Sequence, residues 1–178
     1  MANKLEESVK IPENVTASVS GTVLTAKGPK GEVRRDFFAE NITISVSSGK
    51  ITIASPRDTK RERKVVGSFA AHAKNMLKGV VDGHYFKMKI LSGHFPISVS
   101  VSGRELSVKN FFGEKTPRKL TLPEGVQVNV NGNEIGIESC DREIAGIVIS
   151  SIEKLTRRTG FDRRIFQDGV VIIPEEKA

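Results

Sequence analysis

Alternating apolar and polar positions predict several short strands along the chain. In residues 15–19 and 42–46 every second residue is apolar, a period of two that is typical of a strand with one face on a core. Ser48-Gly49 separates the second run from the apolar Ile51-Thr-Ile53. The run 42–46 and the run 51–53 are therefore expected to form a hairpin that turns at Ser48-Gly49.

The same pattern occurs twice. Val15–Gly21 aligns with Ile97–Gly103 at a spacing of 82 residues, and Ile42–Val46 aligns with Val126–Val130 at a spacing of 84. The change of two residues indicates an insertion in the loop between the two blocks. Two copies of about 80 residues are too few and too long for a solenoid, so a tandem pair of duplicated domains is predicted.

After each predicted hairpin the apolar spacing changes to that of a helix. One helical stripe begins near Asp58 and stops around Gly79, and the other begins at Asp141, placed to cap it, and stops at Gly160. The first stripe consists of Val66, Phe69, Ala70, Ala73 and Leu77, and the second of Ile144, Val148, Ile149, Ile152 and Leu155.

The predicted fold class is therefore α+β, with two tandem homologous domains that each pack a small antiparallel β-sheet against one long α-helix. The predicted domains are residues 1–82 and residues 83–178. His84–Ile90 alternates and is expected to open the second domain as a strand. Gly169–Pro174 is a short apolar run ended by proline and is interpreted as an added edge strand.

Composition narrows the class of protein. The chain of 178 residues has a single cysteine, Cys140, which forms no internal disulfide. No apolar run reaches the roughly 18 residues needed to cross a bilayer. A soluble protein of a reducing compartment is expected, with no membrane partner. The net charge of +7 favours a polyanion, and nucleic acid before a membrane.

Catalytic and metal chemistry find no support in the sequence. The three histidines, His72, His84 and His94, have spacings that match no metal-ligand pattern, and neither a Gly-x-Ser-x-Gly elbow nor a phosphate-binding glycine loop is present. We expect no enzyme, no cofactor, no metal and no small-molecule substrate. Gly28-Pro-Lys-Gly31 lies between two predicted strands, so it is interpreted as a β-turn rather than a clamp on a nucleic-acid backbone.

Cationic side chains cluster in two parts of the second domain. One group lies in the insertion loop, and a denser one follows the second helix, where Phe161 and Phe166 are interspersed with it. Arginine binds phosphate through a planar fork, and an aromatic ring there either stacks on a base or is buried under the domain. If the groups converge, they form a phosphate-binding surface. The predicted RNA-binding residues are Lys115, Arg118, Lys119, Lys154, Arg157, Arg158, Arg163 and Arg164.

A third basic cluster surrounds the start of the first helix. It consists of Arg57, Lys60, Arg61, Arg63 and Lys64. Positive charge at a helix N-terminus opposes the helix dipole. Two interpretations stay open for this cluster, namely a solvated charged face and contact with an anionic partner.

Several longer motifs resemble one family. Asn75-Met-Leu-Lys-Gly-Val80, Tyr85-Phe-Lys-Met-Lys-Ile90, Ser92-Gly-His-Phe-Pro96 and Asp162-Arg-Arg-Ile-Phe-Gln-Asp-Gly169 are similar to motifs of the large-subunit ribosomal protein six family. The last motif points to its archaeal and eukaryotic branch. The resemblance extends from about Ile11 to Ile173.

The resemblance implies a structural, cytoplasmic component of the large ribosomal subunit. Its second domain would be the main contact with large-subunit ribosomal RNA, near the sarcin–ricin loop and the factor-binding side, with neighbouring ribosomal proteins as further partners. Binding would depend on shape and backbone phosphates rather than on base sequence. The alternative is a free-standing RNA-binding regulator outside the ribosome.

Overall fold

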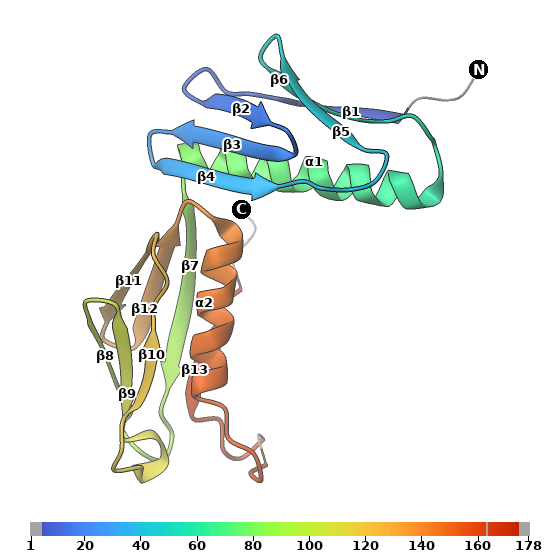
Figure 1. The fold of residues 1–178 in the computed structure, drawn as a ribbon. Helices are drawn as coiled ribbons and strands as arrows, with labels where there is room; N and C mark the ends of the chain where they lie inside the picture. Colours follow the sequence, from blue (N-terminus) through green and yellow to red (C-terminus); the bar gives the residue numbers. More distant parts are fainter. Residues whose placement is uncertain (1–4, 163, 175–178) are drawn as a thin grey trace. The chain divides into compact units, whose positions relative to one another are not determined.

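A computed structural model gives the structure of the protein and describes residues 5–162 and 164–174 (Figure 1). The chain divides into two compact units, unit 1 up to Gly83 and unit 2 from His84 onward. Each unit combines antiparallel strands with one long helix, so the predicted α+β class with two tandem copies is confirmed.

Unit 1 contains two three-stranded sheets, with strand orders β1-β6-β5 and β2-β3-β4. The helix α1 packs against strands of both sheets, and Figure 1 shows it running along them. Buried side chains such as Leu24, Ile53 and Val66 fill the space between strands and helix. The elements are β1 (Leu5–Lys10), β2 (Thr16–Ser20), β3 (Val23–Gly28), β4 (Gly31–Asp36), β5 (Thr43–Ser47), β6 (Lys50–Ser55) and α1 (Lys60–Val81).

Unit 2 repeats this plan and extends it. Its sheets have the orders β10-β9-β8 and β11-β12-β7-β13, so the last strand adds to the edge of the second sheet as predicted. The elements are β7 (His84–Leu91), β8 (Ser98–Ser102), β9 (Glu105–Lys109), the 3₁₀ turn η1 (Phe111–Gly113), β10 (Arg118–Thr121), β11 (Val126–Asn131), β12 (Glu134–Ser139), α2 (Arg142–Leu155) and β13 (Gly169–Ile172).

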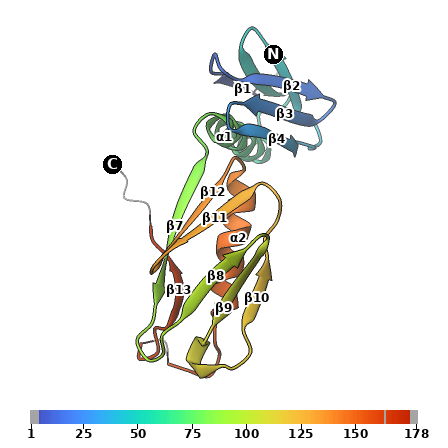
Figure 2. The ribbon, with the colours of Figure 1, turned by 90° about the vertical axis from the view of Figure 1, so that its left-hand side faces the viewer.

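One apolar core joins the layers of unit 2. The helix α2 packs against β7, β12 and β13 of one sheet and against β10 of the other, an arrangement that Figure 2 shows from the side of the strands. Met88, Leu106, Ile137 and Ile152 are fully buried within this core. Because this core is closely packed, the two sheets and the helix keep fixed positions relative to one another within unit 2.

Strand registers confirm the internal repeat. Thr16 pairs with Lys27 in unit 1, and Ser98 pairs with Lys109 in unit 2, at the spacing of 82 residues found in the sequence. In the other sheets Ile44 pairs with Ile53, and Val128 pairs with Ile137 at the spacing of 84.

The two copies differ in the connection between their second and third repeat strands. In unit 1 a tight turn at Gly28–Gly31 joins β3 to β4, so its interpretation as a β-turn is confirmed. In unit 2 the connection from β9 to β10 covers residues 110–117 and contains η1. The predicted insertion therefore lies in this connection between β9 and β10.

Both helices begin close to their predicted positions. Thr59 caps α1 by accepting a hydrogen bond from the Glu62 N–H at 3.5 Å, while Asp58 pairs with Arg63 instead. Asp141 caps α2 by accepting the N–H of Glu143 at 2.8 Å, as predicted.

The predicted helix ends are less accurate. The helix α1 continues to Val81, two residues past Gly79. The prediction that α2 ends at Gly160 is wrong, because the helix ends at Leu155. Thr156 is the C-cap residue at which the helix ends, and its hydroxyl accepts the N–H of Val170 in β13 at 3.0 Å.

Candidate nucleic-acid interface

The C-terminal end of α2 meets the inserted connection of unit 2 through Arg118. Its Nη1 donates to the carbonyl oxygen of Leu155 at 2.6 Å, which satisfies a carbonyl that the end of the helix leaves without a helical partner. The same guanidinium forms a two-pronged pair with Glu114, with Nε–Oε2 at 2.8 Å and Nη2–Oε1 at 2.6 Å. Arg118 is thus bound inside the protein.

The pairing also controls the ionisation of Glu114. Hydrogen bonds from Arg118, with a smaller contribution from the charge of Arg158, hold the pKa of the Glu114 carboxyl below its usual range. In unit 1 a carbonyl oxygen at the end of the helix is also bonded from outside the helix. There the N–H of Lys30, in the short turn, donates to the carbonyl of Val80 at 3.0 Å. Arg118 therefore performs in unit 2 the capping that a backbone N–H performs in unit 1.

A cluster of aromatic rings lies beside this junction. Phe161 contacts Phe166 edge to face, with ring centroids 4.9 Å apart, and Phe112 at 5.5 Å. The guanidinium carbon of Arg158 lies 4.3 Å from the Phe161 centroid and 5.2 Å from that of Phe112. Such cation–π contacts are attractive, so they favour one placement of the Arg158 charge.

Backbone strain accompanies the cluster. Phe112 has φ 50°, in the left-handed region that a bulky residue rarely adopts. Strain of this kind costs of the order of 1–3 kcal/mol and persists only where the surroundings enforce it. The Phe111 ring, 4.9 Å away, and the Phe161 ring supply that packing.

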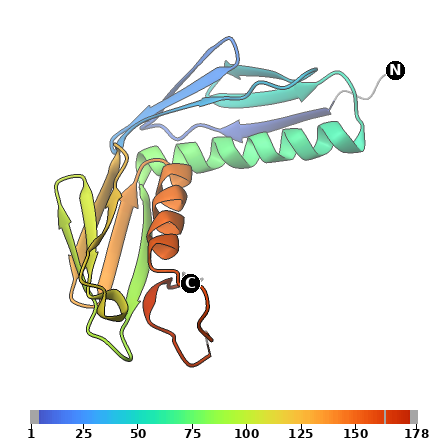
Figure 3. The same cartoon turned by 60° about the horizontal axis from the view of Figure 1, so that its bottom comes forward.

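The segment after α2 is a long loop that turns back before β13, as Figure 3 shows. Asp168 fastens its far end. Its carboxylate accepts hydrogen bonds from the N–H groups of Gly93 and His94 and lies 2.9 Å from the His94 ring Nδ1. Burial opposes ionisation of this side chain, which is 2% exposed, but the hydrogen bonds prevail and lower its pKa.

The near end of the loop is fastened at Thr156. Its buried hydroxyl accepts the N–H of Val170 at 3.0 Å while donating to a carbonyl of α2. The last turn of α2 is therefore tied directly to β13. Because both ends are tied, the described cations of this segment, Arg157, Arg158 and Arg164, lie on a constrained frame.

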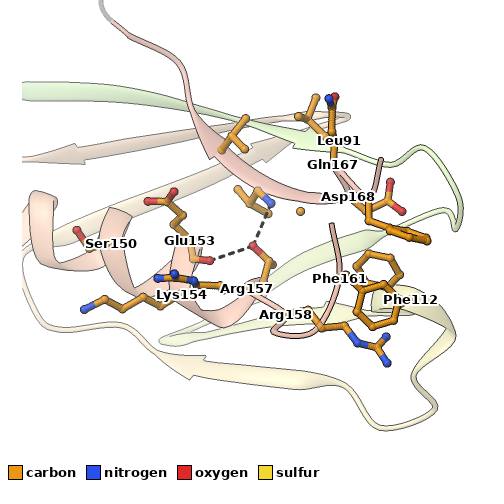
Figure 4. A pocket seen from close by; sticks show the side chains of 15 residues that line it. Leu91, Phe112, Ser150, Glu153, Lys154, Arg157, Arg158, Phe161, Gln167 and Asp168 are labelled. Carbon is orange, nitrogen blue, oxygen red and sulfur yellow. Dashed lines mark hydrogen bonds between the residues drawn. The ribbon is translucent and has the colours of Figure 1, made fainter. Parts of the chain in front are cut away.

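A hollow of about 480 Å³ opens between the end of α2 and this loop (Figure 4). Phe112 and Phe161 lie together at one end with Arg158, while Lys154 and Arg157 lie on the α2 side. Within the described part of the chain, Lys154 and Arg157 have no ion-pair partner, and both are exposed. The structure thus brings together Lys154, Arg157 and Arg158 of the predicted set.

The other predicted residues have different surroundings. Lys119 pairs with Glu105 at 2.9 Å, and strand alternation puts it on the opposite face of β10 from Arg118. Arg164 pairs with Asp162 at 2.7 Å. Lys115 is exposed in the inserted connection, and Arg163 lies outside the described residues.

Sequence reasoning missed the residues that hold the site together. Asp168 and His94 stand in two of the family-like motifs, but nothing in their spacing indicates that they touch. Thr156 follows a predicted helix without any sign of its bond to Val170. A threonine just after an apolar helical stripe is the only local signal of a cap.

Unit 1 carries the third basic cluster at the start of α1. Arg63 is paired with Asp58 through two bonds of 2.5 Å and 2.7 Å, so part of the cluster has a structural partner. Lys60, Arg61 and Lys64 are exposed on the same helix. The cluster is therefore partly a neutralised pair and partly an exposed charged face.

Residues 5–162 and 164–174 contain neither a group of metal-binding side chains nor a membrane-spanning helix. Over these ranges, histidine, cysteine and acidic side chains form no group of three able to hold a metal ion. Neither helix there has the length and apolar character needed to span a membrane.

Fold and site together define a class, namely a tandem α+β protein with a cationic, aromatic edge on its second unit. Residues 11–83 match the family model described as Ribosomal protein L6. The chain is also similar to "Large ribosomal subunit protein uL6" of Methanosarcina mazei, with 40% identity across 97% of this chain and 98% of the relative. Similar proteins of the same name from Saccharolobus solfataricus and Desulfurococcus amylolyticus are 40% and 41% identical, covering 97% of this chain and 96% and 95% of theirs.

The chain therefore belongs to the ribosomal protein L6 family. This family is structural and not enzymatic, in agreement with the expectation from the sequence. The archaeal sources of the relatives agree with the branch that the Asp162–Gly169 motif indicates.

Proposed function

We propose that the chain is a structural component of the large ribosomal subunit, in the cytoplasm, and binds large-subunit ribosomal RNA through unit 2. Its RNA surface consists of Lys154, Arg157, Arg158 and Lys115, at the end of α2 and in the inserted connection. Neighbouring ribosomal proteins are its further partners, and the site lies near the sarcin–ricin loop and the factor-binding side.

The observation that carries this proposal is the gathering of the exposed cations Lys154, Arg157 and Arg158 beside one hollow, with Arg158 held in place. Arg158 is held against two rings, and the loop behind it is tied at Thr156 and at Asp168. A rigid array of cations releases counterions from RNA phosphates without first ordering itself. Arg118, Lys119 and Arg164 contribute less in this proposal, because each is already paired with a carboxylate.

Salt-dependent binding to purified large-subunit ribosomal RNA tests the surface. In a Lys154→Gln, Arg157→Gln variant, the slope of log K against log salt is expected to fall in magnitude by about 0.7–0.9 for each phosphate that is no longer neutralised. The matched control is Lys60→Gln, Arg61→Gln in unit 1, for which a smaller change is expected. An equal change in both would assign unit 1 a share of the RNA surface, and an unchanged slope in the first would remove Lys154 and Arg157 from it.

Sedimentation tests the assembly itself. Stable migration with large subunits at high salt is expected. Recovery only in light fractions would favour the alternative of a free-standing RNA-binding regulator.

A further inference from the structure

We propose that the hollow between α2 and the loop before β13 is a pocket for one unpaired RNA base, stacked on the Arg158–Phe161 pair. This inference rests on the proposed function and adds the feature of RNA that the surface recognises. The volume of about 480 Å³ falls within the roughly 300–1,000 Å³ typical of ligand pockets.

The stacking platform is already assembled. Phe161 is fixed at an interplanar angle of 89° to Phe166 and is still 37% exposed. Arg158 lies against it, 4.3 Å from guanidinium carbon to ring centroid. Unpaired bases in RNA complexes stack on aromatic rings and on arginine guanidinium planes, and both kinds of group line this hollow.

The charges around the hollow separate a base position from a phosphate position. Lys154 and Arg157 line it on the α2 side, so the phosphate of the nucleotide binds there (Figure 4). Helix C-termini carry negative partial charge, which opposes phosphate binding. Here Arg118 and the Thr156 hydroxyl bond to carbonyl oxygens at that end and reduce the opposition.

The two carboxylates of the lining fit the same arrangement. The Asp168 carboxylate is turned to Gly93 and His94 and is almost fully buried, so it does not repel a ligand strongly. Glu153 lines the hollow beside Lys154, and its single negative charge is outweighed there by the two positive charges of Lys154 and Arg157. The uncharged base therefore occupies the aromatic end, next to Phe112 and Phe161.

Only an unpaired base fits this description. In a continuous A-form helix the faces of each base are covered by its neighbours, and the deep major groove excludes side chains. A bulged or looped-out nucleotide presents both a free face and its own phosphate. The pocket thus predicts a preference for RNA that carries an extruded base.

The test compares two RNA hairpins, one with a single bulged adenosine and one identical but fully paired, with the full chain at one salt concentration. The bulged hairpin is expected to bind about 5- to 150-fold more tightly. Phe161→Leu, which keeps an apolar side chain but removes the flat face, is expected to bring the ratio of the two affinities to about one. Because it also removes one of the two rings that hold Arg158, affinity for the paired hairpin is expected to fall as well, so the ratio is the readout. Phe161→Tyr is expected to retain the preference.

The matched control is Phe95→Leu, because Phe95 is 43% exposed in the same unit but does not line the hollow. This variant is expected to keep the preference. Equal binding of both hairpins by the unmodified chain, or a preference that survives Phe161→Leu, would overturn the pocket. If the chain still sediments with large subunits, either of these results overturns the pocket but leaves the proposed function standing. If the preference is preserved but the chain does not sediment with large subunits, the proposed function alone is contradicted.

Discussion

The carboxylate of Asp168 accepts the backbone N–H of His94 and lies 2.9 Å from its ring Nδ1, although the two residues are 74 positions apart. The contact joins the end of the loop after α2 to the segment that follows β7. Phe166 strengthens the junction, since its ring centroid is 4.9 Å from that of His94. Two motifs that are separate in the sequence thus form one clasp that holds the cationic loop.

Replacing Asp168 with asparagine tests the clasp. We expect the free energy of unfolding of unit 2 to fall by about 1–3 kcal/mol at neutral pH, because a neutral amide with a single acceptor oxygen replaces the buried charged acceptor. Urea unfolding measures the difference. The control is Asp162→Asn, whose pair with Arg164 is exposed, so that a much smaller change in stability is expected.

The same clasp predicts a pH dependence. The folded-state pKa of Asp168 is lowered, so its stabilising effect is present above the ordinary carboxyl pKa and disappears as the pH falls through the lowered value. The difference in stability between the unmodified chain and Asp168→Asn is therefore expected to shrink on acidification over that range. A difference that stays constant with pH would show that the ionised carboxylate is not what fastens the loop.

Arg118 is expected to act on stability more than on RNA affinity. Arg118→Ala leaves the Leu155 carbonyl and the Glu114 carboxylate without their donor, so we expect a decrease of about 1–3 kcal/mol in the free energy of unfolding. Arg118→Lys is expected to recover only part of it, because an ammonium cannot replace the planar fork. Lys119→Ala, on the outer face of the strand, is the control. Unchanged stability with reduced RNA affinity in Arg118→Ala would reverse this assignment.

Two separate glycine-to-alanine substitutions, at Gly28 and Gly67, test the packing of unit 1. A Cβ added at Gly28 would lie 2.7 Å from the Val80 carbonyl oxygen, so Gly28→Ala is expected to destabilise unit 1 by about 1–3 kcal/mol in thermal or urea unfolding. Gly67, within α1, has open space around its Cβ position. Gly67→Ala is expected to stabilise the helix by about 0.5–1 kcal/mol, and the opposite order would contradict the packing described for this turn.

Thr156 connects the end of α2 to β13. Thr156→Val keeps the shape of the side chain but removes the acceptor of the Val170 N–H, so that amide is expected to exchange hydrogen faster. The free energy of unfolding is expected to fall by about 1–3 kcal/mol, since the buried N–H stays unsatisfied. Thr121→Val, at an exposed position of β10, is the control. Unaltered protection at Val170 would show that the hydroxyl does not hold the strand.

The repeated elements were predictable because their signals are local. Alternation around Val128 and Ile137, a helical stripe through Val148 and Ile152, and the acidic cap at Asp141 each arise from residues near one another in the chain. The end of α2 was not predictable in this way. Gly160 carries the usual signal for a stop, but the tertiary bond from Thr156 to Val170 ends the helix earlier, at Leu155.

The candidate site was only partly predictable for a related reason. Charge clustering indicates which cations are present, but it leaves open whether the clusters converge, and the contact of Arg118 with the end of α2 is visible only in the structure. Charge clustering also does not indicate which cations have carboxylate partners. Glu114 and Glu105 occupy Arg118 and Lys119, and both pairings depend on how the strand β10 is placed in the fold.

Mapping crosslinks between the full chain and purified large-subunit ribosomal RNA tests the central claim most directly. The account predicts crosslinked peptides from the end of α2 and the following loop, centred on Lys154–Phe161, together with the inserted connection around Lys115. Crosslinks confined to unit 1, or to the outer face of β10 around Lys119, would contradict it.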